Sequence, residues 1–352
     1  MLYFFKMIGL GGGFMNKARL KGVLAVVLAS LCYGVTPMLT NIALKGGVPF
    51  EFAARVSAPA SIMANPSFAM PNESVVAFCM LFGCLFALMG TAVSSKKGMG
   101  SPLRAGRAEA LSMALAGGGS LMATLLLISY AYLYMEPGSV IVLHFCYPAI
   151  ACLTAALFFK ERFSVLKGLA AGAAVSGVYL VSGFSGAENA AGPLLAVLSA
   201  FTYAAYFILG RHGPYKNVSP SVSSVYITGA ASLMGFLAAL ATGRLAAPAT
   251  WFLWLVLALD GVLGYLIGLR LLLYGIRILG SGNAAMLNAL EPVMATVMGV
   301  IVYGETVGAA KGLGCAMVIA SAVIVVADTG RKKRKYRPTG KDGAETGLKS
   351  ST

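Results

Sequence analysis

The chain has 352 residues, of which 58% are hydrophobic and only 11% are charged, and its formal net charge is +15. About a quarter of the residues in soluble domains are charged, so this composition excludes an ordinary soluble domain and indicates a protein embedded in lipid. The basic residues gather in alternate loops between apolar segments, a distribution that argues against a nucleic-acid partner.

Apolar segments long enough to cross a bilayer recur along the whole chain. About 20 apolar residues in a helix span the hydrocarbon core. Windows of that length predict an all-α membrane protein with about ten transmembrane helices. In chain order the predicted spans are 22–43, 74–94, 111–134, 138–159, 164–183, 192–211, 221–242, 251–275, 281–303 and 307–327.

Both ends of the chain are expected to lie outside these spans. Residues 1–21 are a predicted N-terminal cytoplasmic leader, in which Met15 opens the basic stretch MNKARLKG and is a candidate start. The first 14 residues lack the small-residue cleavage site of a secretory signal. Residues 328–352 are a predicted disordered, basic cytoplasmic tail.

The basic residues also predict the orientation in the membrane. With both termini inside, most lysines and arginines face the cytoplasm, which is the positive-inside pattern. We therefore expect a multi-pass protein of the bacterial cytoplasmic membrane with both termini cytoplasmic. The basic residues left outside are Lys45, Arg55, Arg244 and Lys311.

Signatures of enzymes and metal sites are missing from the sequence. It has no GxxxxGK[ST] phosphate loop, no HExxH motif and no CxxC motif. We therefore expect no cofactor, no metal site, no catalytic residue and no ATP-driven transport. The six cysteines, Cys79 among them, lie inside predicted spans and are interpreted as small apolar fillers.

One stretch of the sequence occurs twice. Residues 147–168 align with residues 291–312 at a constant offset of 144 positions, which pairs Pro148 with Pro292. Each proline removes a backbone donor and is expected to kink its span and free carbonyls. Pro148 and Pro292 are therefore the predicted hinge residues.

A second alignment extends the repeat to the start of each half. Residues 21–34 align with residues 191–204, and Tyr33 meets Tyr203. The sequence thus predicts two five-helix repeats, at 22–184 and 192–327.

Five spans per repeat is an odd number, so the second repeat is expected to enter the membrane from the opposite face. Glu161 would then lie inside and its counterpart Glu305 outside. Inverted repeats of this kind are typical of transporters that work by alternating access.

The order and duplication of these features resemble a known family. The basic start MNKARLKG, a first span that contains the pair Tyr33–Gly34, and a repeated x-Pro span ending in KERFSVLKG or YGETVGAAKG are similar to the EamA-type family of the drug/metabolite transporter superfamily. The resemblance covers about residues 15–327 and implies a transporter of amino acids or related metabolites. The chain departs from the family in its Pro-rich loop 46–73, and in Cys79 near a position where the family often has arginine.

Polar residues inside the spans are the candidate site. A charged group near the bilayer centre costs roughly 2.5–3.5 kcal/mol on insertion scales, so the presence of each one requires a functional or structural explanation. His144 and Tyr147 share one helix face, and the repeat maps them onto Asn288 and Glu291. The predicted substrate-binding residues are Tyr33, Thr36, Asn41, His144, Tyr147, Tyr203, Asp260, Asn288 and Glu291.

Each of the charged or titratable candidates also has a structural interpretation. His144 can hold a single tautomer-specific hydrogen bond. Asp260 can pair with a neighbouring helix, and Glu291 can accept hydrogen bonds from a tyrosine or from His144. Burial disfavours the charged form of a carboxylate, so Glu291 is the candidate to accept a proton or to meet an ammonium group.

The sequence as a whole predicts a secondary transporter that exports a small polar or amphipathic metabolite by alternating access. Membrane lipids are its expected surroundings, protons the candidate coupling ion and a homodimer the candidate assembly. Two alternatives stay open. One is a membrane-embedded enzyme acting on a lipid-linked substrate, and the other is a non-transporting membrane assembly partner.

Overall fold

The computed structural model describes residues 17–48, 59–96, 104–131, 133–135, 137–161, 164–182, 190–303 and 306–331. Within these ranges, ten helical spans are long and apolar enough to cross a membrane, and each overlaps one predicted span. The all-α membrane fold and the number of spans are therefore confirmed. Most of the leader and of the tail, together with Glu305, lie outside the described residues.

Six of the spans are single helices. They are α2 (Lys17–Leu44), α4 (Asn72–Lys96), α9 (Val165–Ser182), α10 (Ala191–His212), α11 (Pro220–Ala241) and α16 (Ala309–Arg331). Two short 3₁₀ helices, η1 (Ala60–Ile62) and η2 (Pro66–Phe68), lie in the loop between the first two spans.

The other four spans change their backbone geometry along their length. The third consists of α5 (Arg107–Leu111), the π-helical η3 (Ser112–Gly118) and α6 (Gly119–Ala131), and the fourth of α7 (Pro137–His144) and α8 (Tyr147–Phe159). The eighth consists of α12 (Trp251–Asp260), the π-helical η4 (Gly261–Gly268) and α13 (Leu269–Leu279), and the ninth of α14 (Ser281–Asn288), α15 (Glu291–Met298) and the π-helical η5 (Gly299–Tyr303).

The fourth and ninth spans break at equivalent positions of the two halves. The breaks are at 145–146 and 289–290, which are related by the same offset of 144 as the sequence repeat. Pro148 and Pro292 each sit in the first turn after the break, where a missing N–H costs nothing. Neither proline can donate to the carbonyl four residues earlier, that of His144 or Asn288, so the helical hydrogen-bond ladder is interrupted there.

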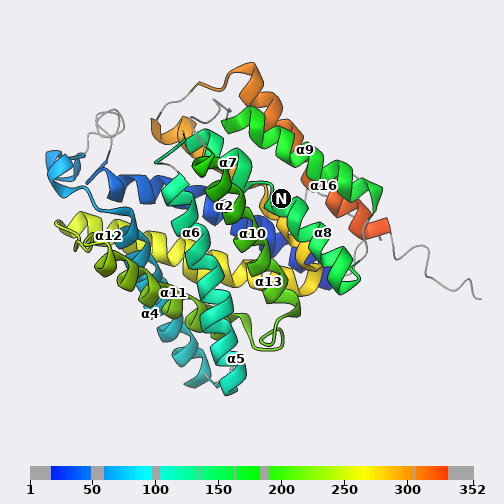
Figure 1. Ribbon diagram of the computed structural model, residues 1–352, viewed down its shortest axis with the longest axis horizontal. Coiled ribbons are helices and arrows are strands. Elements are labelled where there is room, and N and C mark those ends of the chain that lie inside the picture. Colours follow the sequence, from blue (N-terminus) through cyan, green and yellow to red (C-terminus); the bar gives the residue numbers. More distant parts are fainter. Residues whose placement is uncertain are drawn as a thin grey trace, which may run out of the picture.

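The main helix pairs join the first half of the chain to the second. These pairs are α9 with α16, α4 with α11, α6 with α10, and α2 with α13. Figure 1 shows α9 and α16 side by side at one edge of the bundle, and α4 and α11 at the opposite edge. If each span is replaced by its counterpart in the other half, the pairs α9–α16 and α4–α11 each map onto themselves. The pair α6–α10 becomes the pair α2–α13. The contacts thus treat the two halves alike.

Glycines allow the closest of these approaches. A Cβ atom at Gly177 of α9 would lie 2.7 Å from the carbonyl oxygen of Gly314 of α16, and a Cβ at Gly314 would lie 2.5 Å from that of Gly177. Small residues of this kind let membrane helices pack backbone to backbone. The opposite faces of the spans carry exposed apolar side chains, such as Leu157 and Phe158 at 76% exposure. Such faces are suited to lipid.

Candidate functional site

The two broken spans meet at the side chain of Asn288, the last residue of α14. Its Nδ2 donates to the hydroxyl oxygen of Tyr147 at 3.1 Å and to that of Tyr203 at 3.5 Å. Its Oδ1 lies 3.4 Å from the hydroxyl of Ser30, whose shortest hydrogen bond is to the carbonyl of Val26, at 3.0 Å. Asn288 is fully buried, so these contacts link the first, fourth, sixth and ninth spans at one point.

His144 adds a hydrogen bond to the sixth span. Its Nδ1 lies 2.9 Å from the hydroxyl of Ser199, and its ring centroid lies 5.4 Å from those of Tyr147 and Tyr203. Ser199 uses its own proton on the carbonyl of Ala196, at 2.6 Å. The Nδ1 of His144 is therefore the donor, which selects one tautomer, as the structural interpretation of this residue requires.

Glu291 is the acid of this centre and opens α15 directly after the break. Its carboxylate makes no hydrogen bond to any residue in the described part of the chain, and its side chain is partly accessible. It lies within electrostatic reach of the phenol groups of Tyr33, Tyr147, Tyr203 and Tyr265. The N-terminus of a helix favours a negative group, so the break provides a position that suits an acid.

Asp260 forms a second polar centre, between the first, second and eighth spans. The hydroxyl of Thr40 donates to its Oδ2 at 2.8 Å, and the thiol of Cys79 lies 3.3 Å from the same oxygen. Asp260 is 1% exposed, and its Oδ1 has no partner among the described residues. It is the last α-helical residue before the span becomes π-helical, a change that often marks functional positions.

The structure therefore separates the predicted site residues into groups. Tyr33, His144, Tyr147, Tyr203, Asn288 and Glu291 come together, and Asp260 lies in the second centre, linked to the first through Tyr265, which is within electrostatic reach of both acids.

Thr36 and Asn41 contribute less than expected. Thr36 donates to the carbonyl of Tyr33 at 3.1 Å, an oxygen that Pro37 cannot serve because proline has no N–H. Thr36 thus supplies a hydrogen bond that its own helix lacks at this carbonyl, and its methyl group packs toward Gly264. Asn41 is partly exposed, and its side chain makes no hydrogen bond within the described ranges.

Several residues of these centres escaped the sequence analysis, among them Cys79, Thr40 and Ser199. Interpreting Cys79 only as an apolar filler was wrong, because its thiol contacts the Asp260 carboxylate. Thr40 lies one helical turn beyond Thr36, and that spacing could have identified it. Nothing in the sequence distinguishes Ser199 from other small polar residues of a membrane span.

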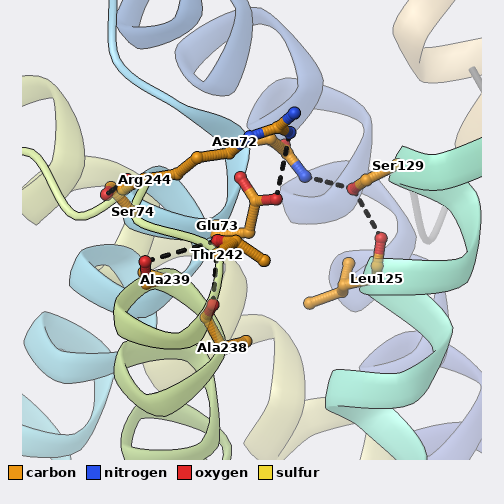
Figure 2. A network of polar contacts seen from close by, with 9 residues as sticks. All are labelled: Asn72, Glu73, Ser74, Leu125, Ser129, Ala238, Ala239, Thr242 and Arg244. Atoms are coloured by element: carbon orange, nitrogen blue, oxygen red, sulfur yellow. Dashed lines mark hydrogen bonds and ion pairs between the residues drawn. The ribbon is translucent and has the colours of Figure 1, made fainter. Parts of the chain in front are cut away.

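A polar network lies where α4 begins and α11 ends, and Figure 2 shows its contacts. Arg244, after α11, lies 3.4 Å from the carboxylate of Glu73 at the start of α4. The hydroxyl of Ser74 donates to the carbonyl of Arg244 at 2.8 Å and accepts from the N–H of Ala246 at 2.9 Å. Asn72 donates to Ser129 at the end of α6. The network joins the second and third spans to the seventh.

A second network ties the halves together through Glu161, which follows α8. Its Oε1 lies 2.8 Å from Nε2 of His212 and accepts from the backbone N–H and the hydroxyl of Ser281, at 3.2 and 3.0 Å. The ring of His212 also stacks on Phe159, with centroids 4.2 Å apart. Glu161 thereby connects the end of the fourth span to the end of the sixth and the start of the ninth.

The charge of Glu161 is stable over the physiological range. Burial raises the pKa of its carboxyl, but the hydrogen bonds from His212 and Ser281 outweigh burial and hold the pKa below its ordinary value. A carboxyl with a lowered pKa stabilises the folded state above its unfolded-state pKa and loses that contribution only as the pH falls through the lowered value. This contact is therefore present at neutral and mildly acidic pH.

Comparison with known proteins agrees with this architecture. The sequence model of the EamA-like transporter family matches residues 190–327, which cover the sixth to tenth spans. A solved structure, titled only as the crystal structure of a protein, superimposes with a TM-score of 0.65 at 18% sequence identity, over 88% of this chain and 97% of its own. At that identity the similarity supports the fold alone. No curated protein sequence matches the chain.

Proposed function

We propose that this protein, whose residues 190–327 belong to the EamA-like transporter family of the drug/metabolite transporter superfamily, exports a small polar or amphipathic metabolite by alternating access. The observation that carries the proposal is the meeting of two broken spans at Asn288, with Glu291 beside it. Broken helices related by an internal repeat, with polar groups at the break, are how many secondary transporters build a binding site near the bilayer midplane.

The chemistry of the centre favours a substrate with an ammonium group. Glu291 has no hydrogen-bond partner in the described part of the chain and lies within electrostatic reach of four phenol groups. A carboxylate attracts an ammonium group, and aromatic faces attract cations and apolar chains. The N-terminus of α8 carries no acidic residue in its first turn and suits a carboxylate through its helix dipole. An amino acid or a related metabolite fits both features.

The two end networks fit the role of gates in alternating access. Glu73 with Arg244 joins the halves at one end, and Glu161 with His212 and Ser281 joins them at the other. If the halves are inverted repeats, opening one network while keeping the other produces the two access states.

Protons are the coupling ion that we propose, since two acids lie inside the spans, and a homodimer is the assembly that we propose.

Binding and flux measurements test the transport function directly. Purified protein is screened for thermal stabilisation by a metabolite library, because a ligand of the folded state raises the unfolding temperature with increasing concentration. Each hit is then tested for flux in proteoliposomes. Stabilisation together with flux supports the transporter. Chemical turnover of a lipid-linked substrate would instead favour the membrane-embedded enzyme, and a stable complex without flux the assembly partner.

The orientation of the halves gives a separate prediction. We expect both termini to be cytoplasmic, with Glu161 and Glu305 on opposite sides of a bacterial cytoplasmic membrane. Single cysteines placed beside each glutamate, in a background without native cysteines, are labelled in intact cells with a membrane-impermeant reagent. We expect labelling beside Glu305 alone. Equal labelling beside both would contradict the inverted repeat.

The proline pair gives another prediction. Pro148→Ala and Pro292→Ala restore the missing backbone donors, so the breaks in the fourth and ninth spans should partly close. Straightening moves Asn288 and Glu291, and we expect the transport rate to fall in each variant while the protein still inserts and stays monodisperse. Pro220→Ala, in the first turn of the unbroken α11, is the matched control. Native rates in both hinge variants would make the prolines packing residues only.

A further inference from the structure

A separate polar pocket lies where the sixth and eighth spans end. It has a volume of about 290 Å³ and is lined by Arg211, His212, Lys216, Asn217 and Arg277. Arg211 and His212 end α10, Lys216 and Asn217 belong to the loop before α11, and Arg277 lies in the last turn of α13. None of these residues belongs to the two polar centres of the spans.

Hydrogen bonds to backbone carbonyls and to one hydroxyl fix the two arginines of this pocket in place. Arg211 donates to the carbonyl oxygen of Arg277. The guanidinium group of Arg277 donates to the carbonyls of Val218 and, at 3.4 Å, of Tyr215, and to the hydroxyl of Ser223 at 3.0 Å. Every one of these acceptors is neutral. The contacts therefore position the cationic groups without compensating their charge.

The positive charges of the pocket lack acidic partners within the ranges that the structure describes. Arg211, Lys216 and Arg277 form no ion pair there, and the carboxylate of Glu161 contacts His212 alone among the lining residues. Like charges held together repel, and an anion between them relieves the repulsion. Basic residues at span ends also direct topology, but topology requires neither a shared pocket nor fixed side chains.

We propose that this pocket binds a phosphate group. Arg211, Lys216 and Asn217 keep side-chain donors that no described residue accepts, and arginine matches the oxygens of phosphate with its planar fork. Arg277 adds its positive charge, while its own donors bind neutral groups of the protein. The pocket lies at the ends of two spans, where lipid headgroups meet the protein, and basic pockets between helices recognise such headgroups. A free phosphate in the aqueous phase has the same chemistry, so the test separates the two sources. The site is separate from the two polar centres of the spans, shares His212 with the network of Glu161, and does not depend on the proposed function.

Thermal unfolding of the purified protein in an uncharged detergent is the test. One arm adds sodium phosphate and is compared with sodium chloride at equal ionic strength. The other adds phosphatidylglycerol, whose phosphate is left with a net negative charge, and is compared with phosphatidylcholine, whose phosphate is neutralised by its own choline group. Lys216 makes no hydrogen bond through its side chain within the described residues, so Lys216→Gln should fold normally. It should raise the apparent dissociation constant about tenfold through loss of a charged hydrogen bond, whereas Lys216→Arg keeps the charge and should retain binding.

Lys17→Gln is the matched control, because it removes the same charge from an exposed position outside the pocket. Stabilisation by phosphate identifies a soluble anion as the ligand, and stabilisation by phosphatidylglycerol alone identifies a lipid headgroup. Either result supports the site if Lys216→Gln weakens it and Lys17→Gln does not. Equal responses to phosphate and chloride together with equal responses to both lipids overturn the proposal. Equal weakening in the two lysine variants overturns it as well.

Discussion

Glu291→Gln should abolish pH-dependent flux while the protein still inserts and remains monodisperse. Glutamine keeps the shape and most of the hydrogen-bonding capacity of glutamate but removes titration and charge. The proposed ion pair between Glu291 and an ammonium group of the substrate should lose about 2–5 kcal/mol when the carboxylate becomes neutral, so we expect transport to fall by about a hundredfold or more. Flux of an identified substrate into proteoliposomes, measured across about pH 5.5–8 to bracket neutral pH, is the readout.

A matched variant separates the role of this acid from a general loss of charge. Glu109 caps the short helix α5 by accepting from the N–H of Gly106 at 2.9 Å. Glutamine can also accept that hydrogen bond, so Glu109→Gln removes the same charge far from the centre and should transport normally. If Glu291→Gln transports at the native rate over the whole pH range, Glu291 has a structural role and the proposed centre is wrong.

The arrangement of the spans follows from features that can be recognised in the sequence. Each span carries enough apolar residues to be recognised by hydropathy alone. The breaks in the fourth and ninth spans coincide with the lost hydrogen bonds of Pro148 and Pro292, but proline alone does not decide the matter, because Pro37 lies inside the continuous helix α2. The repeat then pairs His144 with Asn288 and Tyr147 with Glu291, and the structure indeed places these residues at matching ends of the half-helices.

Contacts between side chains of different spans could not be predicted in the same way. Each contact depends on how two helices are rotated about their own axes. Small residues occur on every face of these helices, so the sequence does not determine that rotation. The contact of Asp260 with Thr40 joins residues 220 positions apart, and that of His144 with Ser199 joins residues 55 positions apart. The end network of Glu73 and Arg244 depends in addition on where the loops return.

Asp260→Asn should stop transport without destabilising the fold. The carboxyl of Asp260 is 1% exposed, no cationic side chain contacts it in the described part of the chain, and its Oδ1 has no partner there. Replacing an uncompensated buried acid by a neutral residue of the same shape is often neutral or stabilising. We therefore expect an unfolding temperature equal to or above that of the native protein, together with a strongly reduced flux.

Thr40→Val supplies the opposite test at the same centre. It removes the hydroxyl that donates to Oδ2 at 2.8 Å and keeps the size of the side chain. Leaving a buried acceptor with one donor fewer should cost about 1–3 kcal/mol of stability. In Asp260→Asn that cost should shrink, because a neutral acceptor needs the hydroxyl less than a carboxylate does. The difference between the two backgrounds, read from thermal unfolding of the single and double variants, measures the coupling.

The two measurements together assign a role to Asp260. A stable but inactive Asp260→Asn means that the acid is retained for the transport cycle at the expense of stability, which is the usual relation at functional sites. A marked fall in the unfolding temperature would show that the carboxylate holds the first, second and eighth spans together. In that case Thr40→Val and Asp260→Asn should be similarly harmful, and the double variant no worse than either one.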